Sequence, residues 1–203
     1  MRIGNLMEKY NFKYQGNDYI YYMNSIDSQY ALILLHGYSF NSDIWDNIGL
    51  SKLLYNKKIQ MLAFDVPGFP KSRNNIKLDE GEIINIVKEL TKGIQKKKIL
   101  LGCSAGAYIA AKAAENNDNI NALVLVGPVD IEKINFDMIK VPIFGIWGSE
   151  DKISDHEKGR EILEKYNGEV KVIIGAGHAC YINEPNKFND IILDIFSSVF
   201  KYK

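Results

Sequence analysis

Residues 98–111 read Lys-Ile-Leu-Leu-Gly-Cys-Ser-Ala-Gly-Ala-Tyr-Ile-Ala-Ala and combine two structural signals in one short stretch. An apolar run ends in the pattern Gly-x-Ser-x-Gly at residues 102–106, and an alanine-rich helical pattern follows directly. A strand that turns sharply into a helix holds the central serine, Ser104, on a strained turn with its hydroxyl clear of the backbone. The flanking glycines permit this turn because a Cβ there would collide with a neighbouring strand or helix. The stretch therefore predicts a nucleophilic serine.

Apolar runs and helical patterns alternate along the rest of the chain. Runs typical of strands buried on both faces occur at residues 30–35, 59–65, 121–127, 141–148 and 170–174. Helical spacing occurs at residues 79–95, 157–166 and 184–200, and a capped helix is expected over residues 44–54. Residues 12–14 and 19–23 flank a turn and indicate a hairpin. This alternation predicts an α/β fold, a mostly parallel central sheet with helices on both faces.

The composition favours an ordinary globular protein. The 203 residues suffice for one well-cored domain, and no linker, repeat or low-complexity tract divides them. We therefore expect residues 1–203 to form a single domain. The 25 basic and 25 acidic residues balance, which argues against recruitment to nucleic acid or to an anionic membrane surface.

The location and cofactor content are predicted from what the sequence lacks. No run approaches the roughly 18 apolar residues of a membrane span, and the first residues contain no apolar core of signal-peptide length. The two cysteines, Cys103 and Cys180, are too few for a disulfide framework or a metal site. We expect a cytoplasmic protein without membrane contact, metal or organic cofactor, as a monomer or small homo-oligomer.

Ser104 would need a base, and the chain offers three histidines. A serine hydroxyl is a poor nucleophile until an oriented base takes its proton. His178 directly follows the last predicted strand, which places it at the carboxyl edge of the sheet with Ser104. His36 opens the turn after the strand at residues 30–35, where a structural ring is expected, and His156 lies in a predicted surface helix. His178 is the favoured base, with His36 as the alternative.

The carboxylate that would orient this histidine has three candidates. Asp151 follows the strand at residues 141–148, just before the histidine strand. Without a catalytic role, Asp151 would stabilise a turn or cap a helix, both common uses of aspartate. Glu150 is its neighbour, and Asp130 follows the preceding strand. We favour Asp151 and keep the other two as alternatives.

Several motifs together resemble the sequential landmarks of the α/β-hydrolase superfamily. They are Leu35-His36-Gly37, Phe64-Asp65-Val66-Pro67-Gly68, Gly102-Cys103-Ser104-Ala105-Gly106, Trp147-Gly148-Ser149-Glu150-Asp151 and Gly177-His178. The order Ser…Asp…His is the one this superfamily uses. Residues 36–42, 65–68 and 175–181 are similar to small members without a cap, the abhydrolase-domain-containing protein fourteen group. The resemblance implies an esterase on small activated esters, or a lysine deacetylase that passes acetyl to coenzyme A.

The oxyanion hole and the substrate pocket are predicted from the loops around Ser104. Ala105 begins the helix, so its backbone N–H is free to stabilise an oxyanion, and the Tyr38 N–H is expected to face the same point. Only residues 131–140 separate two strands where many α/β-hydrolases insert a cap, so an open site is expected. The residues expected to contact substrate are Phe40, Phe69, Val129 and Tyr181.

These features predict a serine hydrolase that cleaves small acyl esters or thioesters through a Ser104–His178–Asp151 triad. Ser104, rather than the adjacent Cys103, is the expected nucleophile because the elbow presents its central residue. The expected partner is a small-molecule acyl substrate. One alternative keeps the triad but passes the acyl group to an amine or to coenzyme A. A second alternative is a catalytically idle fold that binds a partner or a ligand.

Overall fold

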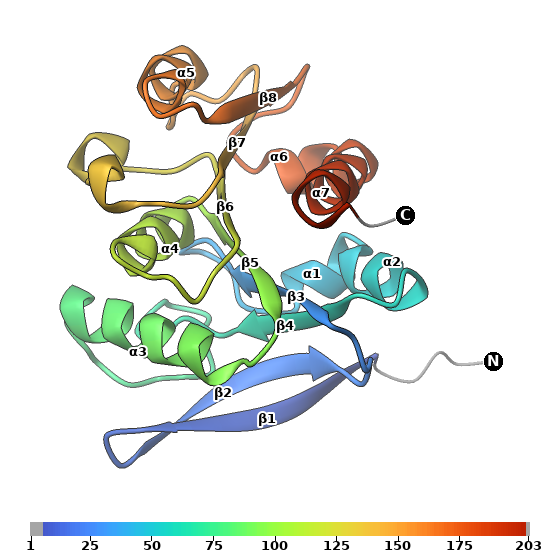
Figure 1. Ribbon diagram of the computed structural model, residues 1–203, viewed down its shortest axis with the longest axis vertical. Coiled ribbons are helices and arrows are strands. Elements are labelled where there is room, and N and C mark those ends of the chain that lie inside the picture. The colour runs from blue at the N-terminus through green and yellow to red at the C-terminus, as the bar shows by residue number, and fades with distance from the viewer. Residues whose placement is uncertain (1–5, 202–203) are drawn as a thin grey trace.

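The computed structural model describes residues 6–201 and contains one eight-stranded sheet with helices on both faces (Figure 1). The strand order is β1-β2-β4-β3-β5-β6-β7-β8. Strands β3 to β8 run parallel, while the β1–β2 hairpin joins β4 antiparallel at one edge. The strands span Met7–Tyr14 (β1), Asn17–Asn24 (β2), Tyr30–Leu35 (β3), Gln60–Phe64 (β4), Lys97–Cys103 (β5), Ala122–Val126 (β6), Ile143–Gly148 (β7) and Glu169–Ile173 (β8).

The central strands are buried on both faces, which explains their continuous apolar runs. Along β3, Ile33 and Leu35 belong to one hydrophobic core, while Leu32 and Leu34 belong to the other. Successive side chains of a strand point to opposite faces, so a run without polar residues supplies two cores at once. The predicted parallel sheet with two covered faces is therefore confirmed.

Two groups of helices cover the sheet (Figure 1). One face packs against α3 (Glu80–Gly93), α4 (Ala105–Ala114) and α5 (His156–Glu164). The other face packs against α1 (Ile44–Asn47), α2 (Leu50–Asn56), α6 (Cys180–Asn183) and α7 (Pro185–Phe200). The helices predicted at residues 79–95, 157–166 and 184–200 are α3, α5 and α7. The helix expected over residues 44–54 is two short helices, because the chain turns at Gly49 with φ +75°.

The hairpin is longer and its turn tighter than the sequence indicates. Its turn is Gln15-Gly16, with φ of 47° and 81°, and the strands pair from Met7 to Asn24. Two successive residues with positive φ form the turn whose twist matches antiparallel strands, so the strands continue up to the turn itself.

The connection between β6 and β7 is short, as expected. It contains two 3-10 turns, Ile131–Lys133 and Phe136–Met138, and buried apolar side chains fix both to the face covered by α4. Within the described residues no cap domain is inserted there. No described helix is both long and apolar enough to cross a membrane.

Candidate active site

Ser104 lies at the sharp turn between β5 and α4, in a strained conformation. Its φ of 53° and ψ of −118° place a non-glycine residue in a sparsely populated region. Close packing enforces the turn. A Cβ on Gly102 would lie 2.1 Å from the carbonyl oxygen of Gly106, and a Cβ on Gly106 would lie 2.3 Å from that of His36. Both flanking glycines are therefore required, as the motif predicts.

The structure brings Ser104, His178 and Asp151 into one hydrogen-bonded chain. His178 Nε2 lies 2.9 Å from Ser104 Oγ, and His178 Nδ1 lies 2.8 Å from Asp151 Oδ2. The Asp151 side chain is fully buried, whereas that of His178 is 21% exposed. The three residues follow β5, β8 and β7, so the parallel sheet delivers them to one edge from positions far apart in sequence.

The second oxygen of Asp151 fixes the orientation of its carboxylate. Asp151 Oδ1 accepts hydrogen bonds from the backbone N–H groups of Ile153 at 2.8 Å and Ser154 at 2.9 Å. With Oδ1 held by two donors, Oδ2 is the oxygen that faces His178. A Cβ on Gly127 would lie 3.2 Å from Asp151 Oδ2 and 3.3 Å from His178 Nδ1, so this glycine allows the pair to pack closely against the end of β6.

The alternative carboxylates lie elsewhere. Asp130 pairs with Lys133 at 3.0 Å and is about half exposed, and Glu150 is exposed. His156 begins α5 and lies 3.1 Å from Glu157. None of these three side chains contacts Ser104 or His178 through a hydrogen bond in the described part of the chain. Asp151 and His178 are therefore the pair that the fold assembles at the serine.

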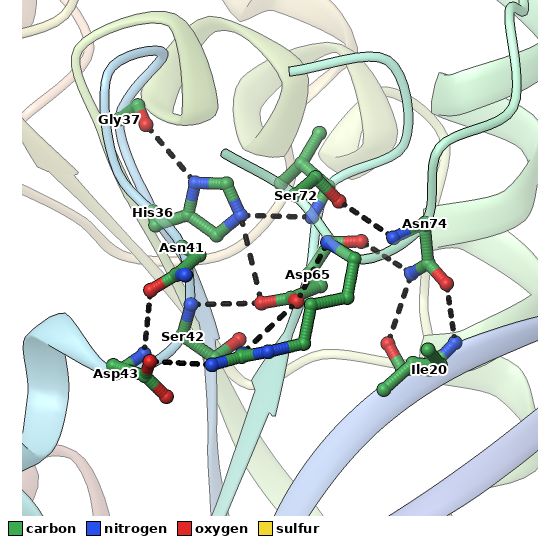
Figure 2. A network of polar contacts seen from close by, with 11 residues as sticks. Ile20, His36, Gly37, Asn41, Ser42, Asp43, Asp65, Ser72 and Asn74 are labelled. Carbon is green, nitrogen blue, oxygen red and sulfur yellow. Dashed lines mark hydrogen bonds and ion pairs between the residues drawn. The ribbon is translucent and has the colours of Figure 1, made fainter. Parts of the chain in front are cut away.

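His36, the alternative base, is locked in a different network (Figure 2). Its Nε2 accepts the Val66 N–H at 3.0 Å, which leaves Nδ1 to donate to the Gly37 carbonyl at 2.9 Å. The ring has no exposed surface, and this burial lowers the pKa of His36. A neutral ring with both nitrogens engaged has no free nitrogen to accept the serine proton, so His36 shapes the loop after β3, as expected.

A buried carboxylate ties that loop to the loop after β4 (Figure 2). Asp65 accepts hydrogen bonds from the backbone N–H of Ser42 at 2.7 Å and of Arg73 at 3.1 Å. The Arg73 guanidinium adds an ion pair to Asp65 at 3.2 Å and another to Asp43. Asn74 bridges onward, its amide group exchanging hydrogen bonds with the backbone of Ile20 in β2. The loop that carries Tyr38 is therefore held from both of its ends.

Two backbone N–H groups are available beside Ser104. Ala105 is the first residue of α4, so its N–H has no partner within the helix. Tyr38 lies inside a tight turn whose hydrogen bond runs from the Phe40 N–H to the Gly37 carbonyl at 3.0 Å. Gly37 packs against Ser104, because its Cβ would lie 3.6 Å from the serine Cβ. The loop that carries Tyr38 is therefore next to Ser104, and the oxyanion hole formed by the Tyr38 and Ala105 N–H groups stays a prediction.

A cavity of about 190 Å³ opens beside Ser104 and His178. Phe40 and Tyr181 line it, as predicted, whereas Phe69 and Val129 do not. Phe69 instead turns edge-on to the rings of His36 and Tyr38, with centroids 5.6 Å and 5.2 Å away. Val129 is half-buried after Pro128, whose carbonyl binds the Ser154 hydroxyl.

Ile153 lines the cavity although the sequence motifs did not predict it. This side chain is 68% exposed although it is large and apolar, and it lies two residues after Asp151. Ser39 and Ala179 line the same cavity. An isoleucine in a polar loop next to the acid is the signal that could have indicated Ile153.

Cys103 and Cys180 are buried free thiols that pack in the core next to triad residues. Burial raises the pKa of the Cys103 thiol well above its usual value and that of Cys180 to about 12. Both thiols therefore stay protonated near neutral pH, and neither is an activated nucleophile.

A sequence match, together with this geometry, identifies the family. Residues 30–135, more than half of the chain, match the alpha/beta hydrolase fold family. The chain belongs to the α/β-hydrolase family. The matched segment includes His36, the loop after β4 and the Ser104 elbow, and the fold supplies Asp151 and His178 beyond it.

Curated proteins with similar sequences include members of the group that the motifs resemble. Protein ABHD14A of Danio rerio is 26% identical over 83% of this chain and 64% of its own length. Human ABHD14A is 26% identical over 88% of this chain and 69% of its own length. "Putative protein-lysine deacylase ABHD14B" of Rattus norvegicus is 23% identical over 84% of this chain and 85% of its own length. This α/β-hydrolase thus spans about two thirds of the ABHD14A proteins and more of ABHD14B.

Solved structures share the fold. A CIB-like hydrolase of Thermoplasma acidophilum superposes with a TM-score of 0.84, covering 95% of this chain and 98% of its own, at 23% identity. The Pyrococcus furiosus esterase Pf2001 superposes with a TM-score of 0.78, covering 95% of this chain and 92% of its own, at 19% identity.

Proposed function

We propose that this α/β-hydrolase is a serine hydrolase that cleaves small acyl esters or thioesters through an acyl-enzyme. The observation that carries the proposal is the chain of short contacts from Ser104 Oγ through the His178 ring to Asp151. In this arrangement Nδ1 donates its proton to Asp151, which leaves Nε2 free to accept the serine proton. A cavity opens directly beside the serine hydroxyl.

The reaction proceeds in two steps. Ser104 Oγ attacks the acyl carbonyl carbon while His178 Nε2 takes its proton, and the backbone N–H groups of Tyr38 and Ala105 donate to the resulting oxyanion. His178 then gives the proton to the leaving alcohol or thiol, whose bond to the acyl carbon breaks. His178 next takes a proton from a water molecule as the water oxygen attacks the acyl carbonyl carbon. The bond between Ser104 Oγ and the acyl carbon then breaks, His178 returns the proton to Ser104 Oγ, and the acid is released.

The cavity limits the size of the acyl group. Its volume of about 190 Å³ lies below the roughly 300–1,000 Å³ of typical ligand sites. The expected substrates therefore carry short acyl chains, while the open edge of the sheet leaves room for a leaving group of any size.

Labelling with a fluorophosphonate probe tests this proposal. Wild-type protein should be labelled, Ser104→Ala should not, and His178→Ala should be labelled far more slowly. Ser39→Ala is the matched control because Ser39 lines the same cavity without contacting His178 through a hydrogen bond, and it should be labelled like wild type. A folded wild-type protein that fails to react would refute the proposal and favour the idle binding fold.

A second candidate function uses the same residues with a different acceptor. The relative named as a protein-lysine deacylase covers 84% of this chain, and the uncapped edge would admit an acylated lysine side chain. In that case the acyl group passes from Ser104 to an amine or to coenzyme A instead of to water. Turnover of an acetyl-lysine peptide that depends on added coenzyme A would support this function, and turnover of simple esters without coenzyme A would support hydrolysis.

A further inference from the structure

One polar side chain of the acyl cavity is buried and has no role in the triad, that of Tyr181. Tyr181 lies in α6 and is only 3% exposed. Three aromatic rings hold its ring in place, with centroids 6.2 Å away at Phe40, 6.0 Å at Trp45 and 5.8 Å at Phe188. The position of the hydroxyl is therefore fixed by packing rather than by a polar partner.

The hydroxyl has no hydrogen-bond partner among residues 6–201. Burial and the neighbouring thiols of Cys103 and Cys180 raise the pKa of Tyr181, so the O–H stays protonated and remains a donor. The hydroxyl opens onto the cavity, where water can accept its hydrogen bond, so a bound molecule that displaces this water without replacing the bond leaves the O–H unpaired at a cost in free energy. Since Tyr181 lines the cavity beside Ser104, the missing partner can come from a molecule bound there.

The hydroxyl lies close to the Ser104 side chain. The point where a Cβ on Gly37 would sit is 3.5 Å from Tyr181 Oη and 3.6 Å from Ser104 Cβ. Both groups are thus in van der Waals reach of one carbon-sized position. The exposed side chains of Tyr38 and Ile153 mark the open side of the cavity, through which the leaving group exits. Tyr181 is on the buried side, which is left to the acyl group.

We propose that Tyr181 is a specificity-determining residue whose hydroxyl donates a hydrogen bond to an oxygen on the substrate's acyl chain. The preferred substrates are then esters or thioesters of short acyl groups with a hydroxyl or keto oxygen one or two carbons from the carbonyl. This inference rests on the proposed serine hydrolase function. Its physical basis is asymmetric discrimination: a bound acyl group without the oxygen displaces water from the Tyr181 hydroxyl and leaves this donor unpaired, whereas an apolar pocket would favour the plain chain.

The test compares two p-nitrophenyl esters, the butyrate and the 3-hydroxybutyrate, on wild type and Tyr181→Phe. The substitution removes only the hydroxyl and keeps the ring among its aromatic neighbours. Tyr19→Phe is the matched control, because Tyr19 in β2 is also a buried tyrosine, 2% exposed, but does not line the cavity. Rates are corrected for spontaneous hydrolysis, and circular dichroism melting checks that each variant folds.

Wild type should hydrolyse the hydroxybutyrate with a kcat/KM about 10–100-fold above that for the butyrate, the size expected of one buried hydrogen bond. Tyr181→Phe should lose this preference by slowing the hydroxybutyrate alone, and Tyr19→Phe should keep it. Equal rates on both esters in wild type would overturn the inference, whether or not the variant folds. An equal loss on both esters in Tyr181→Phe would also overturn it, because the hydroxyl would then serve the oxyanion or the fold.

These outcomes are separable from a failure of the proposed function. If the inference alone fails, wild type still reacts with the fluorophosphonate probe and hydrolyses both esters through Ser104. If the proposed function fails, folded wild-type protein neither reacts with the probe nor hydrolyses either ester.

Discussion

Replacing Asp151 with Asn changes the tautomer of His178 while leaving the fold almost untouched. Asp151 Oδ1 accepts the backbone N–H groups of Ile153 and Ser154, so the single oxygen of an asparagine amide must stay at that position. The NH₂ group then replaces Oδ2 and faces His178 Nδ1. Two donors cannot bond to each other, so Nδ1 becomes an acceptor and the ring proton moves to Nε2. In that tautomer Nε2 cannot take the proton of Ser104.

The expected loss of activity follows from the wrong tautomer. In a serine protease triad the same substitution lowers kcat by about 10⁴, which corresponds to about 5.4 kcal/mol on the barrier. Folding should change little, because the asparagine keeps both backbone hydrogen bonds of Oδ1. We expect the free energy of unfolding to fall by less than about 2 kcal/mol.

The assay is the steady-state hydrolysis of p-nitrophenyl acetate at pH 8, with urea unfolding of each variant in parallel. Asp130→Asn and Glu150→Gln are the controls, because these carboxylates were the alternative partners for the histidine and lie away from it. Both should retain wild-type kcat. A kcat of Asp151→Asn within about tenfold of wild type, or an equal loss in either control, would refute this reasoning.

Three further predictions concern the frame around the triad. Asp65→Ala should lower the free energy of unfolding by about 2–4 kcal/mol in urea, since it leaves the backbone N–H groups of Ser42 and Arg73 without their acceptor and removes one of the two carboxylates that pair with the Arg73 guanidinium. Burial lowers the pKa of His36, so as the pH falls the unfolded chain binds a proton at this histidine before the folded chain does. The contribution of His36 to the free energy of unfolding is therefore fully present above about pH 6.5, and below that pH the free energy of unfolding falls by up to about 1.4 kcal/mol per pH unit. In His36→Gln the free energy of unfolding should depend less on pH. Gly106→Ala should abolish fluorophosphonate labelling even where the protein folds, since its Cβ would lie 2.3 Å from the His36 carbonyl oxygen and must displace the elbow; labelling at the wild-type rate would contradict this.

The positions of Ser104, His178 and Asp151 could be predicted because each follows directly from a local pattern. An apolar run marks the end of a strand, and in a parallel sheet every strand that ends in this way delivers the next residues to one edge. This prediction that the three residues share one edge requires neither the order of the strands in the sheet nor the positions of the helices between them. The short connection at residues 131–140 predicted the missing cap in the same way, because length alone excludes an inserted domain.

The walls of the cavity could not be predicted in this way, since they depend on how loops pack against each other. Phe69 and Phe40 look alike in the sequence, as phenylalanines in the loops after β4 and β3. Only in three dimensions does Phe69 turn onto His36 and Tyr38, while Phe40 faces Tyr181. The Asp65 network that holds both loops joins residues up to 54 positions apart, a relation that no local pattern contains.

His36 and His178 show how the surroundings of one residue type decide its chemistry. Both follow a strand at the same edge of the sheet. The partners of His36 are a backbone N–H and a backbone carbonyl, which together fix one neutral tautomer and leave neither nitrogen free. The partners of His178 are a carboxylate on one side and a hydroxyl on the other, so a proton accepted from the hydroxyl is stabilised by the charge opposite. The first environment suits a ring that fastens a loop, and the second suits a base.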